Sequence, residues 1–264
     1  MSRLALIDAD SIVYIIAYNH KESLESLVLE SCDSVYKMIM EGSQATHYFG
    51  SFSPKISFRD KEYLYAPYKG TRGVKPDWVT QWESTIKNYF IEKYGFVIPK
   101  DLEADDIVAA ASVLHTTEEV IICSPDKDMK QIAGLHFDYK KPTEGIKVVS
   151  SYEASVNFWT QMLCGDDVDN IKGVPGLGPK KVSELFSKVL PDSDCFDMEL
   201  HFLVKEQYTK YFGEYYGSII YDQTFNTVKM LMPSHPYWGT YKEEITFLHS
   251  IGVFSNPESF QIMP

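Results

Sequence analysis

The sequence predicts an α/β protein whose mostly parallel central sheet is flanked by helices and followed by a helical region. Three observations predict this class. Short apolar runs typical of buried strands alternate with helical patterns up to about residue 150, acidic residues follow two of these runs, and beyond residue 151 the pattern becomes almost wholly helical. We therefore expect an α/β core in residues 1–150 and a helical region in residues 151–264, packed on that core.

The expected elements can be justified in chain order. Residues 4–7 form a continuous apolar run, as in a buried parallel strand, and residues 24–39 carry apolar side chains at helical spacing. Pro76 suits the first turn of a helix, whereas residues 61–75, rich in Tyr, Pro, Gly and Lys, indicate a loop. Strands are expected at 4–7, 46–49, 120–123 and 146–149, and helices at 24–39, 76–94, 101–114, 151–164, 178–189 and in two or three further segments to about residue 232. No element can be assigned to the tail, 233–264.

The composition narrows the function classes. The 264 residues include 37 acidic and 25 basic side chains, a net charge of −12, and 44% are hydrophobic, which favours a sizeable core over disorder. No apolar run approaches the ~20 residues that span a bilayer and the N-terminus lacks a signal-peptide pattern, so we expect a cytoplasmic protein. The acidic excess argues at first against nucleic acid. Four scattered cysteines predict neither a zinc site nor a disulfide framework: Cys32, Cys123, Cys164 and Cys195.

Eight acidic residues in four segments are predicted to meet at one place. Two of the segments follow strands, whose carboxyl ends carry the ligand sites of such sheets, and the other two lie at helix ends, with acids three residues apart. Carboxylates gathered without a counter-charge would repel one another, so a cation is expected among them. Hard oxygen ligands suit Mg²⁺ or Mn²⁺, and two ions about 4 Å apart suit phosphodiester hydrolysis. The eight residues are Asp8, Glu103, Asp105, Asp106, Asp126, Asp128, Asp166 and Asp169.

The distribution of charge along the chain nevertheless favours nucleic acid as a partner. Setting the eight predicted metal ligands aside changes the net charge from −12 to −4, so local basic clusters stand out. One cluster lies in a single loop, and the other surrounds the turn of sequence GVPGLGP; this pattern is typical of proteins that contact phosphate. The clusters are Lys69, Arg72 and Lys75, and Lys172, Lys180, Lys181 and Lys188.

Each acidic motif has an ordinary structural explanation when taken singly. An acid at a helix start can be a cap, and SPDKD or DN can be a turn. LIDAD also resembles the start of haloacid-dehalogenase phosphatases, but the later Gly165–Asp169 motif is one residue short of that family's spacing and Glu103, Asp105 and Asp106 stay unexplained. GVPGLGPK lacks the Gly-Lys-Ser/Thr ending of a phosphate loop, and DDVDNIKG has Ile171 where a calcium loop needs an oxygen ligand.

Taken together, the motifs resemble those of the flap endonuclease, or 5′-nuclease, family, especially stand-alone bacteriophage 5′-3′ exonucleases and the 5′-nuclease domain of bacterial DNA polymerase I. The matching pieces occur in the family order from residue 4 to about 190. They are LALIDAD (4–10), FR (58–59) with PYKGTR (67–72), LEADD (102–106), SPDKD (124–128) and GDDVDNIKGVPGLGPKKV (165–182).

The resemblance implies a fold, a site and partners. The fold is a PIN-like core with a short helical arch at about 66–100, followed by a helix–three-turn–helix element at about 151–190. The eight acids would bind metal, Lys69 and Arg72 would contact the scissile phosphate at the base of the arch, Lys75 would bind DNA nearby, and Tyr68 would stack on an unpaired base. The turn would hold duplex backbone and bind K⁺ through its carbonyls. Its residues are Gly173, Gly176, Gly178, Lys180 and Lys181.

The sequence departs from the family in one place that bears on the metal site. The family has an aspartate near residues 50–53, where this chain has Gly50, Ser51 and Ser53. Asp10 lies two residues beyond Asp8, so we hypothesise that it partly replaces the absent ligand; the alternative is that Asp10 caps a helix beginning near residue 11. The arch is short, and no clamp-binding tail is visible after residue 250.

The function that the resemblance implies is a monomeric, metal-dependent 5′-3′ exodeoxyribonuclease and 5′-flap endonuclease in phage DNA replication, in the cytoplasm of the host cell. Its substrates would be DNA with a 5′ end, flap or gap, and RNA primers in RNA–DNA hybrids. Two rivals stay open from the residues themselves. One is a dehalogenase-type phosphatase; the other, favoured by the absent aspartate, is a catalytically weak DNA-binding protein of the same fold.

Overall fold

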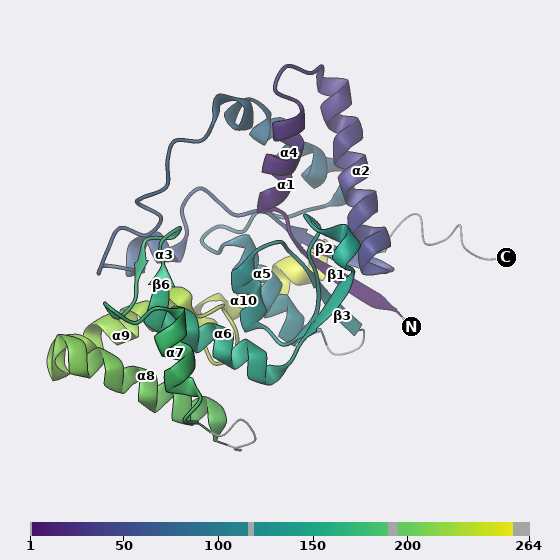
Figure 1. Cartoon of the computed structure of the whole chain (residues 1–264). Coiled ribbons are helices and arrows are strands. Elements are labelled where there is room, and N and C mark those ends of the chain that lie inside the picture. The colour runs from purple at the N-terminus through teal and green to yellow at the C-terminus, as the bar shows by residue number, and fades with distance from the viewer. Residues whose placement is uncertain (1, 116–118, 190–194, 256–264) are drawn as a thin grey trace.

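The computed structural model describes residues 2–115, 119–189 and 195–255. A six-stranded sheet with the order β5-β4-β3-β1-β2-β8 forms its centre (Figure 1). Strands β1, β2, β3 and β4 run parallel, whereas β5 and β8 pair antiparallel at the two edges. The strands are β1 (Arg3–Asp8), β2 (His47–Ser51), β3 (Glu119–Cys123), β4 (Gly134–Phe137), β5 (Ile146–Val149) and β8 (Phe254–Ser255).

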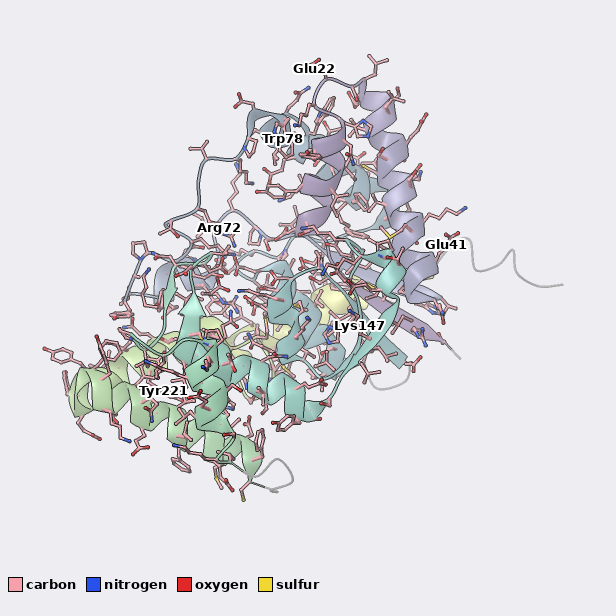
Figure 2. The ribbon with its side chains drawn as sticks, viewed as in Figure 1. Glu22, Glu41, Arg72, Trp78, Lys147 and Tyr221 are labelled. Carbon is pink, nitrogen blue, oxygen red and sulfur yellow. The ribbon has the colours of Figure 1, made fainter. Side chains whose placement is uncertain are left out.

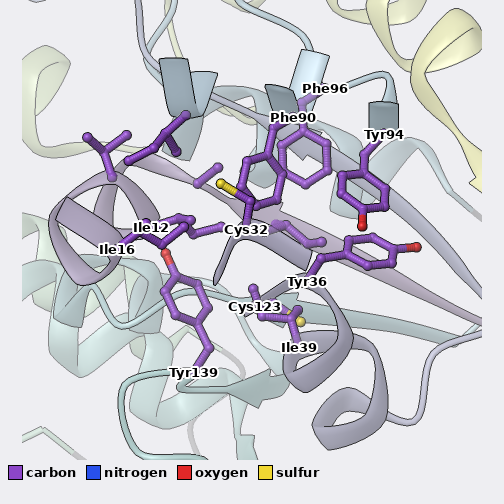
Figure 3. Packing of buried hydrophobic residues seen from close by; sticks show 14 of the residues in the cluster. Ile12, Ile16, Cys32, Tyr36, Ile39, Phe90, Tyr94, Phe96, Cys123 and Tyr139 are labelled. Atoms are coloured by element: carbon purple, nitrogen blue, oxygen red, sulfur yellow. The ribbon is translucent and has the colours of Figure 1, made fainter. Parts of the chain in front are cut away.

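Helices cover both faces of this sheet because alternate side chains of each strand point to opposite sides. Ala5 and Ile7 of β1 face a core formed with α1 (Asp10–Asn19), α2 (Glu25–Ser43) and α4 (Asp77–Tyr94). Figure 3 shows this core from close by, with the rings of Tyr36 and Tyr94 stacked at 3.9 Å between centroids.

The opposite face of the sheet packs against two other helices. Leu4 and Leu6 of β1 lie in a second core with α5 (Ala104–Leu114) and α10 (Trp238–Gly252). The short helix α3 (Phe58–Glu62) and the one-turn helices η1 (Lys127–Gln131) and η2 (Pro142–Glu144) complete this part of the chain. Leu4, Leu6, Ala5 and Ile7 all have no exposed surface, as expected for a strand buried on both faces.

The helical region forms a third core beside the sheet (Figure 1). Its helices are α6 (Ser151–Cys164), α7 (Pro179–Phe186), α8 (Phe196–Phe212) and α9 (Glu214–Val228), and a small antiparallel pair, β6 (Gly165–Asp166) and β7 (Ile171–Lys172), lies between α6 and α7. Trp159, Leu200 and Tyr208 are fully or almost fully buried there. Within the described ranges, no helix has the length and apolar character needed to cross a bilayer.

The structure confirms the predicted fold class and adds elements that the sequence did not reveal. The mostly parallel sheet, its flanking helices and the helical region are present as expected. Helix α1 begins near residue 11, as one alternative for Asp10 required; the additions are α3, η1, β4, η2, β6, β7, α10 and β8. The last two belong to the tail, and they return to the sheet and its second core rather than extending the helical region.

Candidate metal and phosphate site

The predicted acids gather at the carboxyl edge of the sheet. β1 and β3 are parallel neighbours, so Asp8 at the end of β1 lies beside the segment that follows β3 and carries Asp126 and Asp128. A cavity of about 170 Å³ lies at this edge. Seven carboxylates line it together with two cations and three other side chains: Asp8, Asp10, Glu103, Asp105, Asp126, Asp128 and Asp169, with Lys69, Arg72, Ser11, Tyr14 and Ser53.

Asp8 is held in an environment that disfavours its charged form. Its side chain is 6% exposed and accepts a 2.7 Å hydrogen bond from the hydroxyl of Ser124. Burial, followed by the neighbouring charges of Asp10 and Asp126, raises the pKa of Asp8 to about 7. Burial and the adjacent Asp126 likewise raise the pKa of Asp128 to about 7. The neighbouring protein groups therefore do not compensate the ionised forms of Asp8 and Asp128.

Glu103 occupies the N-cap position of α5 and accepts hydrogen bonds from three side chains. Lys69 forms an ion pair with it, the hydroxyl of Tyr68 donates to it at 2.8 Å, and Arg59 donates to it at 3.3 Å. Although burial opposes the change, Lys69 and then Arg59 lower the pKa of Glu103. In contrast, burial and the charge of Asp106 raise the pKa of Asp105 well above its ordinary value.

The loop that carries the two predicted phosphate-binding cations is fastened to the segment after β6. The N–H of Lys69 donates to the carbonyl of Asp169 at 2.8 Å, and the side-chain amide of Asn170 donates to the carbonyl of Pro67 at 2.8 Å. Arg72 pairs with the carboxylate of Asp169. In the view of Figure 2, Arg72 lies between Trp78, near the start of α4, and Tyr221 in α9. The loop thus carries both cations to the acidic cavity.

Two of the eight predicted ligands lie outside the cavity lining. Asp166 is 4% exposed and pairs with the ammonium of Lys127 at 2.8 Å; although burial opposes the change, this pairing lowers the pKa of Asp166. Asp106 has no exposed surface and both of its oxygens face Arg59. Asp106 nevertheless offers an oxygen close to those of its neighbours in α5.

Tyr68 and Ser51 are placed differently from what we expected. The ring of Tyr68 is 9% exposed and belongs to the core of the helical region, so stacking on an unpaired base is not available to it in this conformation. Ser51 pairs with Asp8 in register but is fully buried, with its hydroxyl 3.4 Å from the carbonyl of Val97. Ser53, two residues further, is the position that lines the cavity, and its main-chain N–H donates to Asp10.

Three further residues at the site carried no functional prediction from the sequence. The hydroxyl of Ser124 donates to Asp8, Tyr14 lines the cavity, and the guanidinium of Arg59 donates to Glu103. Arg59 lies in one of the matched motifs, which was the only signal available for it. Lys75 pairs with Glu83 at 2.7 Å and lines a neighbouring cleft rather than the cavity itself.

The glycine-rich turn forms a second hollow in the helical region. A cavity of about 510 Å³ is lined by Gly173, Gly176 and Gly178 together with neighbouring residues of the turn. Gly173 passes so close to α6 that a Cβ there would come within 2.2 Å of the carbonyl oxygen of Leu163, and Gly176 has φ +82°. The ammonium of Lys181 donates to the carbonyl of Gly176 at 2.9 Å. Lys180 is exposed at the start of α7.

The donor set at the acidic cavity fits a divalent cation. Glu103 and Asp105 line the cavity, and an oxygen of each lies within 4.8 Å of the other and of an oxygen of Asp106 behind them. The raised pKa values of Asp8, Asp105 and Asp128 mean that their ionised forms are disfavoured by burial and by neighbouring carboxylates, an effect that a bound cation reverses. Oxygen donors of this kind select hard divalent ions. A PIN-like core whose acidic cavity is also lined by the cationic side chains of Lys69 and Arg72 is typical of a metal-dependent nuclease.

Comparison with known proteins supports this class. Residues 3–157 match the family model described as the 5′-3′ exonuclease N-terminal, resolvase-like domain. The chain is 30% identical over 200 residues to flap endonuclease Xni of Shewanella amazonensis, covering 70% of this chain and 77% of that protein. Xni of Shewanella pealeana is 32% identical over 139 residues, 49% of this chain and 54% of the relative, so the chain spans about half of that protein. The zinc-bound 5′-exonuclease of bacteriophage T5 shares the fold with a TM-score of 0.55 at 17% identity, covering 94% of this chain and 99% of its own.

The chain therefore belongs to the 5′-3′ exonuclease family. It is a phosphodiester hydrolase of the 5′-3′ exonuclease and flap endonuclease class, as the motifs predicted. This membership removes the dehalogenase-type phosphatase from the alternatives.

Proposed function

We propose that this protein is a Mg²⁺-dependent nuclease that removes nucleotides or flaps from the 5′ ends of DNA. Its substrates are DNA with a 5′ end, a flap or a gap, and RNA primers in RNA–DNA hybrids, and it acts as a monomer in DNA replication in the cytoplasm. The observation that carries the proposal is the single cavity that combines seven carboxylates with Lys69 and Arg72.

The acidic side chains supply the metal-binding part of the proposal. When bound, two Mg²⁺ ions would supply a nucleophile at neutral pH and stabilise the leaving oxygen of a phosphodiester. We propose that the ions are held by acids lining the cavity, with Asp166 beside it, and that Mn²⁺ can replace Mg²⁺. The proposed ligands are Asp8, Glu103, Asp105, Asp126, Asp128, Asp166 and Asp169.

Lys69 and Arg72 would stabilise the charge on the scissile phosphate. Both already contact acids of the site, Glu103 and Asp169, so a phosphate bound among these acids lies within their reach. Positioned cations aimed at developing negative charge accelerate such reactions strongly, because little reorganisation is needed as the reaction proceeds.

The glycine-rich turn would hold the duplex. Its exposed main-chain groups, the hollow beside Gly176 and the cations Lys180 and Lys181 suit a phosphate backbone, and its carbonyls suit K⁺. Lys75, in the cleft next to the acidic cavity, would contact the strand that enters the site.

The test uses purified protein with duplex, flap and gapped DNA and an RNA–DNA hybrid, each labelled at either the 5′ or the 3′ end. With Mg²⁺ we expect short 5′-derived products and intact 3′ ends, and with EDTA no cleavage. Release from 3′ ends, or cutting that persists in EDTA, would contradict the proposal. Fluorescence anisotropy of labelled duplex in EDTA, with K⁺ in place of Na⁺, measures the effect of K⁺ on duplex affinity.

A further inference from the structure

Arg59 is buried next to the acidic cavity and uses every donor that its side chain has. It is 2% exposed. Nε donates to the carbonyl of Thr227 at 2.7 Å, and Nη2 donates to the carbonyl of Lys229 at 3.3 Å. The remaining donors bind the carboxylates of Glu103 and Asp106. A guanidinium has five N–H groups, and here each has an acceptor.

Asp106 is the main counter-charge of this buried cation. Its two oxygens accept from Nη1 and Nη2 of Arg59 in a two-pronged pair, with Nη2 at 2.8 Å, and Oδ1 also accepts from the N–H of Leu231 at 3.1 Å. The carboxylate has no exposed surface. The hydrogen bonds that Asp106 accepts thus come from Arg59 and from the chain after α9, whereas Asp105 lines the cavity.

The pair joins three parts of the chain that are far apart in sequence. Arg59 comes from α3, Asp106 from the first turn of α5, and the accepting carbonyls and the Leu231 N–H from the end of α9 and the segment that follows it. Since Arg59 also donates to Glu103, the same guanidinium that anchors the helical region reaches a side chain of the metal site.

We propose that Arg59 and Asp106 are positioning residues: the buried pair holds Glu103 in place and fastens the end of α9 behind the acidic helix, and Asp106 is not a metal ligand. Oε2 of Glu103 accepts from Arg59 and from the hydroxyl of Tyr68, and Oε1 pairs with Lys69. The inference rests on the proposed metal site, but its tests need no nucleic acid.

The first test compares Asp106→Asn with its neighbour Asp105→Asn by thermal unfolding in EDTA. Breaking a buried ion pair leaves Arg59 uncompensated, so Asp106→Asn should lower Tm by on the order of 10 °C. Asp105→Asn removes a carboxylate whose charge is disfavoured and should leave Tm unchanged or raise it. If Asp106→Asn behaves like Asp105→Asn in EDTA, Asp106 is not an anchor and the proposal fails.

The second test asks whether the pair positions Glu103 or only stabilises the fold. Arg59→Lys keeps the charge but cannot serve both carboxylates with a planar fork. We measure Mn²⁺ binding by electron paramagnetic resonance at a temperature where circular dichroism shows the variant fully folded. Affinity should fall by roughly 10-fold or more, the usual effect of losing a group that orients a metal ligand. If the folded Arg59→Lys variant binds Mn²⁺ as tightly as the wild-type protein, the pair only stabilises the fold. The proposal that it positions Glu103 would then be wrong.

A double variant tests the proposal even if the single variants fail to fold. Arg59→Met with Asp106→Leu replaces the pair by apolar side chains, so Tm should recover toward that of the unchanged protein, as often happens for buried pairs. Mn²⁺ affinity should remain low, because Glu103 still lacks the hydrogen bond from Arg59. If the wild-type protein does not cut DNA but the Tm and Mn²⁺ affinity results are as expected, the proposed function is wrong and the positioning role of the pair is supported.

Discussion

The carboxylate of Asp10 accepts a 2.9 Å hydrogen bond from the main-chain N–H of Ser53. The hydroxyl of Ser53 in turn accepts from the N–H of Ala104 at 2.9 Å, at the first residue of α5. These contacts connect the start of α1, the segment after β2 and the acidic helix. Asp10 therefore lines the cavity next to Ser53, and it is the first residue of α1 rather than its N-cap, which is Ala9.

This arrangement predicts how the metal requirement responds to substitution. Asp10→Asn should raise the Mg²⁺ concentration needed for half-maximal cleavage, because Mg²⁺ depends on carboxylate charge. Ser53→Asp should lower it by adding a carboxylate at the cavity. Ser51→Asp serves as the matched control: Ser51 is buried, so this change should destabilise the fold. A Mg²⁺ titration of cleavage measures the first two changes, and thermal unfolding measures the third. An unaltered titration curve for Asp10→Asn would remove Asp10 from the metal site.

Asp126 and Asp128 should be needed for cleavage but not for folding. Asp126→Ala or Asp128→Ala should abolish cutting of labelled DNA, as should chelation, while Tm in EDTA stays the same or rises because a repelled charge is lost. Asp138→Ala, an acid outside the cavity lining, is the control and should cut normally. Undiminished cutting by either variant would remove the proposed site.

The raised pKa of Asp8 predicts a pH-dependent difference in stability. Because its pKa is about 7 in the fold and ordinarily 3.8, the stabilising contribution of its protonated form is lost as pH rises from about 4 through 7. In EDTA, Asp8→Asn should therefore have a higher Tm than the unchanged protein at pH 8. The gain should shrink at pH 5.5, where Asp8 is protonated. Equal gains at both pH values would mean that Asp8 has an ordinary pKa.

The basic residues of the turn should control duplex affinity. Replacing Lys180 and Lys181 together by Ala should weaken duplex binding and reduce the slope of log affinity against log salt by up to ~0.9 for each phosphate that is no longer neutralised. Turnover at saturating DNA should change little, since neither side chain lines the acidic cavity. Lys147→Ala, a distant lysine paired with Glu144, is the control. Fluorescence anisotropy at several salt concentrations measures the slopes.

Local signals made much of the fold predictable. Residues 4–7 and 120–123 are continuous apolar runs, and they became β1 and β3. Helix α6 begins where expected because Ser150 and Glu153 form a capping box. By contrast, β4 has the sequence GLHF, without a continuous apolar run, and β8 is recognisable as a strand only through its pairing with His47 and Tyr48. Such pairings depend on tertiary contact and leave no local pattern.

The site was predictable as a set of acids but not as a network. The positions after strands and at helix ends indicated six of the seven carboxylates that line the cavity, and also Asp106 and Asp166, which lie outside its lining. The sequence could not indicate that Asp106 turns toward Arg59, 47 residues away, or that Tyr68 is buried with its hydroxyl on Glu103. Nor could it distinguish Ser51 from Ser53, because the chain leaves the sheet at Ser51 and only the later residue reaches the cavity.

Lys69 should affect the chemical step more than binding. It pairs with Glu103 at the cavity, on a loop fixed to Asp169, so its ammonium is held beside the place where a phosphate would react. Lys69→Ala should lower turnover by roughly 10²–10³, the range for losing one positioned charge-stabilising group. Duplex affinity should change much less, because the turn and its lysines still hold the backbone.

Single-turnover cleavage and anisotropy, measured on the same DNA, separate these two effects of Lys69→Ala. Lys61→Ala is the matched control, since Lys61 is an exposed lysine paired with Asp101 and lies outside the cavity lining; it should leave both quantities unchanged. A Lys69→Ala protein that binds duplex weakly but cuts at the normal rate once saturated would reverse the roles of the two basic clusters. The loop would then hold DNA, and the charge on the reacting phosphate would have to be stabilised by Arg72 and the bound metal.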